Sequence, residues 1–217
     1  MNMMKEWLKN IVQSLVPGNF LVYHGSRRRK EIALTFDDGP NPAFTAKVLD
    51  LLKELDIKAS FFLVGSEIKK NAVLARRIKE EGHGVCNHTY SHRTVRDLSL
   101  NMWLDEIRQT NGQLATLGHN GVVLVRPPHG TLTTPFVYAA LRTSSKIALW
   151  SIDSLDWQRA GSDKILKAVF ARPLLNGDII LMHDDNESTL TALPELISRA
   201  IGDGFSFVTL EHLWGKF

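Results

Sequence analysis

Two adjacent carboxylates, Asp37 and Asp38, stand where a short apolar segment ends. Residues 32–34 are apolar and flanked by charge, which predicts a buried strand of a parallel sheet. Gly39 and Pro40 then turn the chain out of the sheet. Adjacent like charges are costly unless a cation or a proton relieves them, so one carboxylate could bind a metal while the other acts as a base. Taken alone, the motif could also be a solvated Asp-Asp turn.

Two histidines four residues apart, His88 and His92, offer further metal ligands. On a helical turn, side chains at this spacing share a face, with β-carbons about 5–6 Å apart, so both imidazoles could reach one ion. Together with one aspartate they leave a fourth position open for water, which is the pattern of catalytic zinc. The same ligand set also suits non-haem Fe(II) oxygenases, and histidine pairs are common on protein surfaces.

Further polar residues follow apolar segments later in the chain. Arg126 has a planar guanidinium that suits pairing with a carboxylate, either in a site or in an ordinary salt bridge at the end of the sheet. His183 follows the apolar run 179–182, so it could be a general acid titrating near neutrality or a satisfied core histidine. Asp156 is a candidate to orient His183. Trp157 offers a flat face for stacking on a sugar, or belongs to the core.

The order of the predicted elements explains why these residues should meet. Apolar strand-like segments alternate with amphipathic helical segments about seven times, which predicts a parallel sheet with right-handed crossovers. The expected strands are 32–34, 59–64, 84–86, 122–125, 147–152, 178–182 and 205–208, and the expected helices are 42–55, 67–81, a segment around 103–114, 135–141, 164–170 and 193–201. Because no GxGxxG turn is present, a closed or nearly closed α/β barrel is expected instead of a dinucleotide-binding fold. Parallel strands gather their carboxyl ends on one face, so the clusters should share one pocket.

Composition narrows the class of protein. The chain of 217 residues is 44% hydrophobic and 23% charged, as expected of an ordinary globular domain. Its net charge is +3, from 26 basic and 23 acidic residues, which gives no case for nucleic acid. The basic run 27–30 could touch an anionic glycan or lipid, although a solvated lead into a strand is the simpler interpretation. Cys86 is the only cysteine, so no internal disulfide can form.

Residues 1–30 are expected to form an N-terminal amphipathic helix and a connector, and residues 31–217 a second region that holds all the polar clusters. The helix is indicated by apolar residues at helical spacing, namely Trp7, Leu8, Ile11, Val12 and Leu15. It lacks the continuous apolar run and the cleavage site of a signal peptide, and no later segment is long enough to span a membrane. A cytoplasmic location is therefore expected.

Together, the clusters resemble the five motifs of the polysaccharide deacetylases of carbohydrate esterase family 4. In chain order, the matching segments are Thr35-Phe36-Asp37-Asp38-Gly39-Pro40, His88-Thr89-Tyr90-Ser91-His92, Arg126-Pro127-Pro128-His129-Gly130, Asp153-Ser154-Leu155-Asp156-Trp157 and Leu181-Met182-His183. The match runs from about residue 31 to residue 212. The resemblance implies that 31–217 is a catalytic domain folded as a single distorted (β/α)7 barrel, an α/β protein. It also implies metal-dependent removal of acetyl groups from N-acetylated sugars.

The resemblance assigns a role to each metal-site residue. Asp37 would be the base that takes a proton from a water activated by the metal. Asp38, His88 and His92 would be the metal ligands. The metal would be one divalent ion, usually Zn²⁺, with Co²⁺ or Ni²⁺ able to substitute.

It also implies roles for the remaining candidates. Arg126 would hold Asp37, and His183, tuned by Asp156, would protonate the leaving amine. Two apolar side chains would shape the pocket, with Leu181 lining the space for the acetyl methyl and Trp157 forming a wall of the groove. His129 departs from the family pattern, which often has Tyr or Phe at this position. Its backbone N–H is expected to help hold the oxyanion, so the change should not abolish activity.

The leading hypothesis is therefore a hydrolase that removes acetyl groups from N-acetylglucosamine units of a polysaccharide or oligosaccharide. Its partner would be an N-acetylated glycan such as a chitin oligomer, peptidoglycan or an exopolysaccharide. Two alternatives stay open. The chain could be an O-deacetylase of the acetylxylan type, or a non-catalytic glycan-binding protein.

Overall fold

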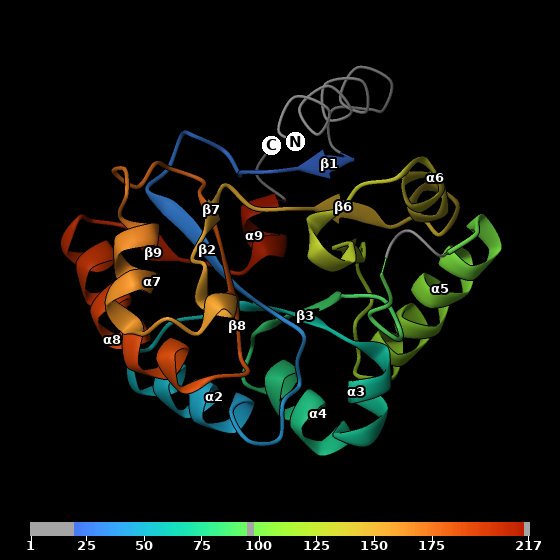
Figure 1. The fold of residues 1–217 in the computed structure, drawn as a ribbon, viewed down its shortest axis with the longest axis horizontal. Helices are drawn as coiled ribbons and strands as arrows, with labels where there is room; N and C mark the ends of the chain where they lie inside the picture. The colour runs from blue at the N-terminus through green and yellow to red at the C-terminus, as the bar shows by residue number, and fades with distance from the viewer. Residues whose placement is uncertain (1–19, 95–97, 215–217) are drawn as a thin grey trace.

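The computed structural model describes residues 20–94 and 98–214, which form an α/β barrel with one parallel sheet at its centre (Figure 1). The strands are β1 (Leu21–Val22), β2 (Glu31–Asp37), β3 (Ser60–Leu63), β4 (Gly84–Asn87), β5 (Leu124–Val125), β6 (Lys146–Ala148), β7 (Ile152–Asp153), β8 (Ile179–His183) and β9 (Ser206–Phe207). Their order is β1-β6-β5-β4-β3-β2-β8-β7, with β9 beside β2, and each of these pairings is parallel.

Helices surround the sheet on its outer side (Figure 1). They are α2 (Thr45–Glu54), α3 (Gly65–Lys70), α4 (Ala72–Glu80), α5 (Leu100–Thr116), α6 (Thr134–Arg142), α7 (Ser162–Val169) and α8 (Glu187–Gly202). A last helix, α9 (Leu210–Trp214), packs on the inner side instead. Two short 3₁₀ turns, η2 (Pro128–Gly130) and η3 (Asp156–Gln158), follow β5 and β7. The single-domain distorted barrel expected from the sequence is confirmed. Within the described ranges, no helix is long and apolar enough to cross a membrane.

The alternation of side chains along the strands separates two apolar layers. On β2, Ile32 and Leu34 belong to the large core between the sheet and the helices, whereas Ala33 belongs to a smaller cluster inside the barrel. Small side chains such as Cys86 share this inner cluster, which Leu210 and Leu213 of α9 complete. Further along the inward face of β2, Ala33 is followed by the buried polar residues Thr35 and Asp37. The interior therefore changes from apolar to polar toward the carboxyl ends of the strands.

The segment expected as one strand over 147–152 is two strands. β6 lies beside β1 and β5, whereas β7 lies beside β8 at the other end of the sheet. Between them, the Leu149 N–H donates to the Val22 carbonyl at 2.8 Å and the Ser151 N–H donates to the Ile179 carbonyl at 3.0 Å. This short piece of chain therefore bridges the two ends of the sheet, and the prediction of a continuous strand was wrong because the chain changes partners halfway.

Other boundaries also differ from those expected. The helix expected from residue 42 begins at Thr45, because the Asn41 side chain accepts a hydrogen bond from the Ala43 N–H at 2.9 Å and forms a local turn. The helix expected over 67–81 is divided at Asn71 into α3 and α4. β1 and α9 were not expected, and β1 places part of the connector in the sheet. The predicted N-terminal helix lies outside the described residues.

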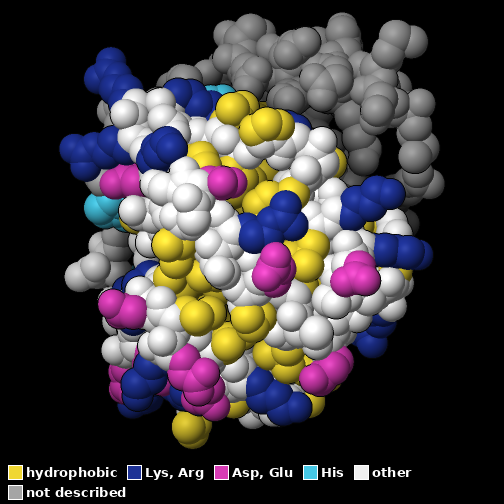
Figure 2. Space-filling view, turned by 90° about the vertical axis from the view of Figure 1, so that its left-hand side faces the viewer, with side chains coloured by type: hydrophobic (Ala, Val, Ile, Leu, Met, Phe, Trp, Pro, Cys, Tyr) yellow, Lys and Arg dark blue, Asp and Glu magenta, His cyan; other side chains and the backbone are white. Residues whose placement is uncertain are grey.

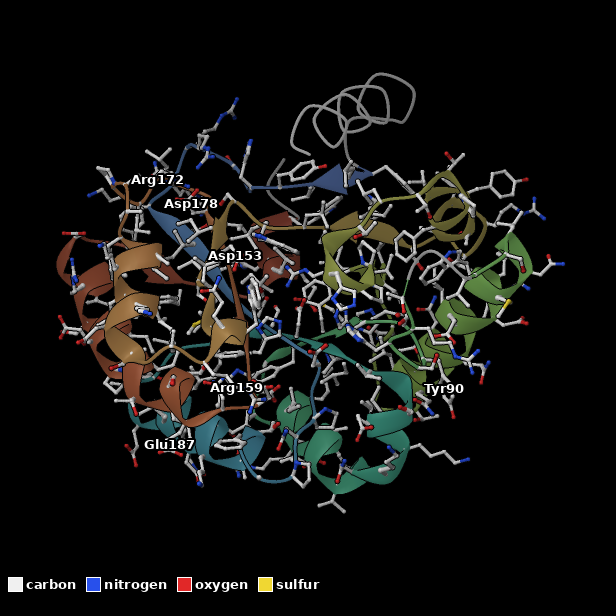
Figure 3. The ribbon with its side chains drawn as sticks, in the orientation of Figure 1. Tyr90, Asp153, Arg159, Arg172, Asp178 and Glu187 are labelled. Carbon is white, nitrogen blue, oxygen red and sulfur yellow. The ribbon has the colours of Figure 1, made fainter. Side chains whose placement is uncertain are left out.

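Acidic and basic side chains are interspersed on the face of the molecule shown in Figure 2. A buried carboxylate lies at the amino end of β8, where Asp178 accepts hydrogen bonds from the partly exposed Arg27 at 3.1 Å and Arg172 at 2.8 Å. Figure 3 shows Arg172 beside Asp178. Arg27 of the basic run 27–30 thus pairs with a buried carboxylate of the same chain, which gives this residue a structural role.

Two glycines provide a matched test of backbone strain. Gly177 has a φ of +77°, and a Cβ there would lie 2.5 Å from the Gly25 carbonyl oxygen, whereas a Cβ at Gly112 in α5 would meet nothing within 4 Å. We expect Gly177→Ala to lower the free energy of unfolding by at least about 1–2 kcal/mol. Gly112→Ala should raise it by about 0.5–1 kcal/mol. Urea unfolding of both metal-free variants measures this, and a Gly177→Ala protein as stable as the parent would contradict the account.

Candidate active site

A cavity of about 470 Å³ opens at the carboxyl ends of the strands and collects the predicted site residues. Its lining includes Asp37, Asp38, His88, His92, His129, Trp157, Leu181 and His183. The other two candidates, Arg126 and Asp156, are fully buried behind it and contact residues that line it. All ten side chains thus belong to one region, as the convergence of strand ends predicts.

The pairing of β2 with β8 places two of the reactive residues opposite each other. Asp37 and His183 are register partners at the carboxyl ends of these neighbouring strands, and Thr35 and Leu181 are partners two residues earlier. Residues two apart on a strand share a face, so Leu181 and His183 both point toward the cavity that they line. The sheet itself therefore fixes the relation between the two sides of the site.

Asp37 is held by a buried cation. Arg126 is fully buried, and its Nη1 donates to Asp37 Oδ1 at 2.5 Å and to Thr35 Oγ1 at 3.1 Å. Its Nε and Nη2 donate to the carbonyls of Ala148 and Leu149 at 3.1 and 3.0 Å. The guanidinium is thus fixed by four acceptors, and one oxygen of Asp37 is turned away from the cavity. The other oxygen, Oδ2, lies 3.6 Å from His88 Nε2.

Asp38, His88 and His92 form the one group of potential metal ligands found in the described part of the chain, with ligand atoms all within 4.8 Å of one another. Asp38 Oδ1 lies 3.3 Å from His88 Nε2 and 3.2 Å from His92 Nε2. This oxygen is buried and accepts no hydrogen bond within the described structure. A buried carboxylate oxygen without a donor, facing two imidazole nitrogens, is a donor set suited to a divalent cation. The three residues therefore fit a metal.

The protonation states of the three side chains agree with this. His88 Nδ1 lies 2.9 Å from the Arg126 carbonyl, which can only accept, so Nδ1 carries the proton and Nε2 keeps a free lone pair toward Asp38. Burial lowers the pKa of His92 to about 4, and a proton on the neighbouring His88 would lower it further, so its imidazole is neutral at neutral pH. Burial alone would raise the pKa of Asp38, but the three neighbouring histidines hold it well below its usual range. An imidazole must be neutral and a carboxylate ionised to bind a metal ion.

His183 is oriented by a fully buried carboxylate. Asp156 Oδ1 accepts from His183 Nδ1 at 2.7 Å, while its Oδ2 accepts from the His183 N–H at 2.6 Å and from Thr189 Oγ1 at 2.8 Å. Burial alone would lower the pKa of His183, but this bond and the charges of Asp156, Asp37 and Asp38 raise it to about 9. His183 is therefore protonated at neutral pH.

His129, Trp157 and Leu181 lie in the wall of the cavity. His129 has a left-handed φ of 56°, and its ring centroid lies 5.1 Å from that of His92. Trp157 is 56% exposed, whereas Leu181 is only 4% exposed. An exposed indole beside a polar cavity suits stacking on a sugar ring better than a core role. The sequence left these two interpretations of Trp157 open, and its exposure rules out the core.

Several residues near the site were not among the sequence candidates. Asp153 and Arg159, both labelled in Figure 3, line the cavity, and Arg159 forms an ion pair with Asp185 at 2.8 Å. Asp184 is buried and accepts a hydrogen bond from Thr45 Oγ1, and burial raises its pKa to about 7. It packs so closely on Gly39 that a Cβ there would lie 2.7 Å from Oδ2. Asp153 belongs to a motif that the sequence identified, and Asp184 follows His183 in the cluster expected at the end of the sixth strand, but no role could be assigned to it from the sequence.

Comparison with known proteins agrees with this geometry. The family model described as polysaccharide deacetylase matches residues 24–147. A peptidoglycan-N-acetylglucosamine deacetylase of Bacillus cereus is 33% identical over 196 residues, covering 88% of this chain and 71% of the relative. A chitooligosaccharide deacetylase of Rhizobium leguminosarum bv. trifolii is 34% identical, covering 83% of this chain and 90% of the relative.

A solved structure shows the same fold. The crystal structure of a peptidoglycan N-acetylglucosamine deacetylase in complex with a hydroxamate-type benzamide has a TM-score of 0.87 and 32% identity, and the match covers 94% of this chain and 97% of that one. The family model, the relatives and the solved structure point to the family indicated by the five motifs. The chain belongs to the polysaccharide deacetylase family.

Proposed function

We propose that this chain hydrolyses the acetamido group of N-acetylglucosamine units in a glycan, releasing acetate and leaving a free amine. One observation carries the proposal. The three-residue metal site lies beside an anchored carboxylate, Asp37, and a protonated imidazole, His183, which face each other across the β2–β8 pair. Amide hydrolysis needs both a base and an acid. The activities for which the relatives are named support the choice of an acetylated glycan as substrate.

Asp38, His88 and His92 would hold one divalent cation, most simply Zn²⁺, with Co²⁺ or Ni²⁺ as substitutes. When bound, such an ion acts as a Lewis acid that polarises the acetyl carbonyl and lowers the pKa of water toward about 7. The neutral imidazole of His92 and the ionised carboxylate of Asp38 are ready to bind it without a change of protonation.

Asp37 would take a proton from the water that attacks the acetyl carbon. Its Oδ1 is bound to Arg126, so its Oδ2 is the oxygen available toward the metal site. The attack forms a carbon–oxygen bond and places negative charge on the former carbonyl oxygen. The backbone N–H of His129, which lies in the wall of the cavity, would donate a hydrogen bond to that oxygen.

His183 would then donate its proton to the sugar nitrogen as the carbon–nitrogen bond breaks. An amine leaves readily only when it is protonated, so an acid distinct from the base is needed. Asp156 keeps His183 protonated at neutral pH and fixes the ring by its Nδ1, which leaves Nε2 as the atom that donates. Leu181 would contact the acetyl methyl, and Trp157 would stack on the sugar.

Acetate release tests the proposal directly. Protein stripped with a chelator and reloaded with Zn²⁺ or Co²⁺ should release acetate from chitin oligosaccharides or peptidoglycan, and the stripped protein should not. Acetylated xylan is offered in parallel, because release from xylan alone would establish the O-deacetylase alternative. Binding of these glycans without any acetate release would instead support a non-catalytic glycan-binding protein.

The role proposed for Asp37 predicts that its substitution affects turnover but not metal binding. Asp37→Asn removes the base but none of the three ligands, so the variant should retain its metal while kcat falls by at least roughly 100-fold. Metal content by elemental analysis and acetate release together measure this. His88→Ala is the comparison variant, because it should lose the metal itself. Near-normal turnover in Asp37→Asn would refute the assignment.

The His183–Asp156 bond predicts a pH-dependent stability in the metal-free protein. The pKa of His183 is raised from 6.5 to about 9, so its contribution to stability is fully present below pH 6.5 and is lost as the pH rises through 9. Asp156→Asn should bring the pKa of His183 down and remove this part of the loss. Urea unfolding below pH 6.5 and above pH 9, with NMR titration of His183, measures both effects. If the free energy of unfolding changes as much between the two pH values in Asp156→Asn as in the parent protein, the account is wrong.

A further inference from the structure

A carboxylate outside the proposed mechanism holds the turn that carries both histidine ligands. The turn joins His88 to His92, and Glu106 of α5 lies against its middle. We propose that Glu106 is a positioning residue that fixes this turn and thereby sets the affinity of the site for its metal. The inference rests on the metal site of the proposed function and concerns binding of the ion, not the later chemical steps.

Glu106 accepts three hydrogen bonds from two consecutive residues of the turn. Its Oε2 accepts from the backbone N–H groups of Tyr90 at 2.9 Å and Ser91 at 2.8 Å, and its Oε1 accepts from Ser91 Oγ at 2.6 Å. Hydrogen bonds to an ionised carboxylate are stronger than those between neutral groups. No Lys or Arg side chain within the described ranges forms an ion pair with Glu106. All the hydrogen bonds described for its carboxylate are made to the turn.

The carbonyl groups of the same turn are held from the opposite side. The Thr89 carbonyl accepts from the Gly65 N–H at 2.9 Å, and the Tyr90 carbonyl accepts from the Ser66 N–H at 2.8 Å. Both donors belong to the first turn of α3. Figure 3 shows Tyr90 beside α3 and α5. The turn thus lies between two helices, with its acceptors bound by α3 and its donors bound by Glu106.

The turn needs such support because its backbone is strained. Thr89 and His92 have left-handed φ values of 64° and 51°, which non-glycine residues adopt only at a cost. The strain persists only if the surroundings impose it. Without Glu106, the Tyr90 and Ser91 N–H groups would have no carboxylate partner, and the turn could relax toward ordinary conformations. The Nε2 atoms of the two histidines would then no longer be held within reach of Asp38.

The test compares variants of two neighbouring residues on one helix. Glu106→Ala removes the acceptors, and Glu106→Asp keeps the charge on a shorter side chain. Asp105→Asn is the control, because Asp105 is exposed and also loses a charge. The Zn²⁺ dissociation constant is measured by competition with a chelator, along with the Tm of each metal-free protein and acetate release at limiting and saturating Zn²⁺.

We expect Glu106→Ala and Glu106→Asp to raise the Zn²⁺ dissociation constant by roughly 10–100-fold, as loss of other residues that orient metal ligands does. Asp105→Asn should leave it unchanged, and saturating Zn²⁺ should restore much of the acetate release of the Glu106 variants. A lower metal-free Tm with an unchanged dissociation constant would show a merely structural role and overturn the proposal. If Glu106→Ala weakens Zn²⁺ binding but Glu106→Asp does not, the charge of the side chain and not its position would matter, and the proposal would be overturned.

These outcomes are separable from failure of the proposed function. If the parent protein binds Zn²⁺ but releases no acetate from any glycan, the function is refuted while the effect of Glu106 on the dissociation constant still decides this inference. If the parent protein does not bind Zn²⁺, the metal site is refuted and the role of Glu106 with it.

Discussion

The buried ion pair between Arg126 and Asp37 is the constraint on which the rest of the site depends. A guanidinium with no exposed surface must have its donors satisfied, and Arg126 achieves this with acceptors from β2 and from the segment after β6. Its Cζ atom also lies 3.8 Å from the centre of the Phe62 ring. Breaking a buried pair by removing one partner typically costs about 3–5 kcal/mol. The orientation of Asp37 is therefore tied to the closure of the barrel.

The other parts of the site repeat this arrangement, with one residue facing the cavity and a buried partner behind it. His183 faces the cavity and Asp156 lies behind it, while His88 faces the cavity and the Arg126 carbonyl lies behind it. Each partner occupies one atom of the side chain, which leaves the other atom directed toward the cavity. The site is thus organised before any ligand binds, and little reorganisation is needed during the reaction.

The sequence predicted the site better than the details of the fold. The candidate residues follow apolar segments, and parallel strands bring their ends together, so ten candidates could be placed in one region without a structure. The sequence could not show that 147–152 divides into two strands, because its apolar pattern is the same whichever neighbour it pairs with. Nor could it identify Glu106, because a glutamate in an amphipathic helix has no feature that separates a solvated acid from one that binds a turn.

The register between β2 and β8 has a consequence for how such proteins can diverge. Asp37 and His183 are paired residues on hydrogen-bonded strands, so insertion or deletion of a single residue within either strand would rotate the following side chains to the opposite face of the sheet. The lengths of these two strands are thus fixed by the chemistry. Beyond Asp38 and Asp184, which follow the two strands directly, the loops carry no such register, so evolutionary changes in length are expected at the rim of the barrel.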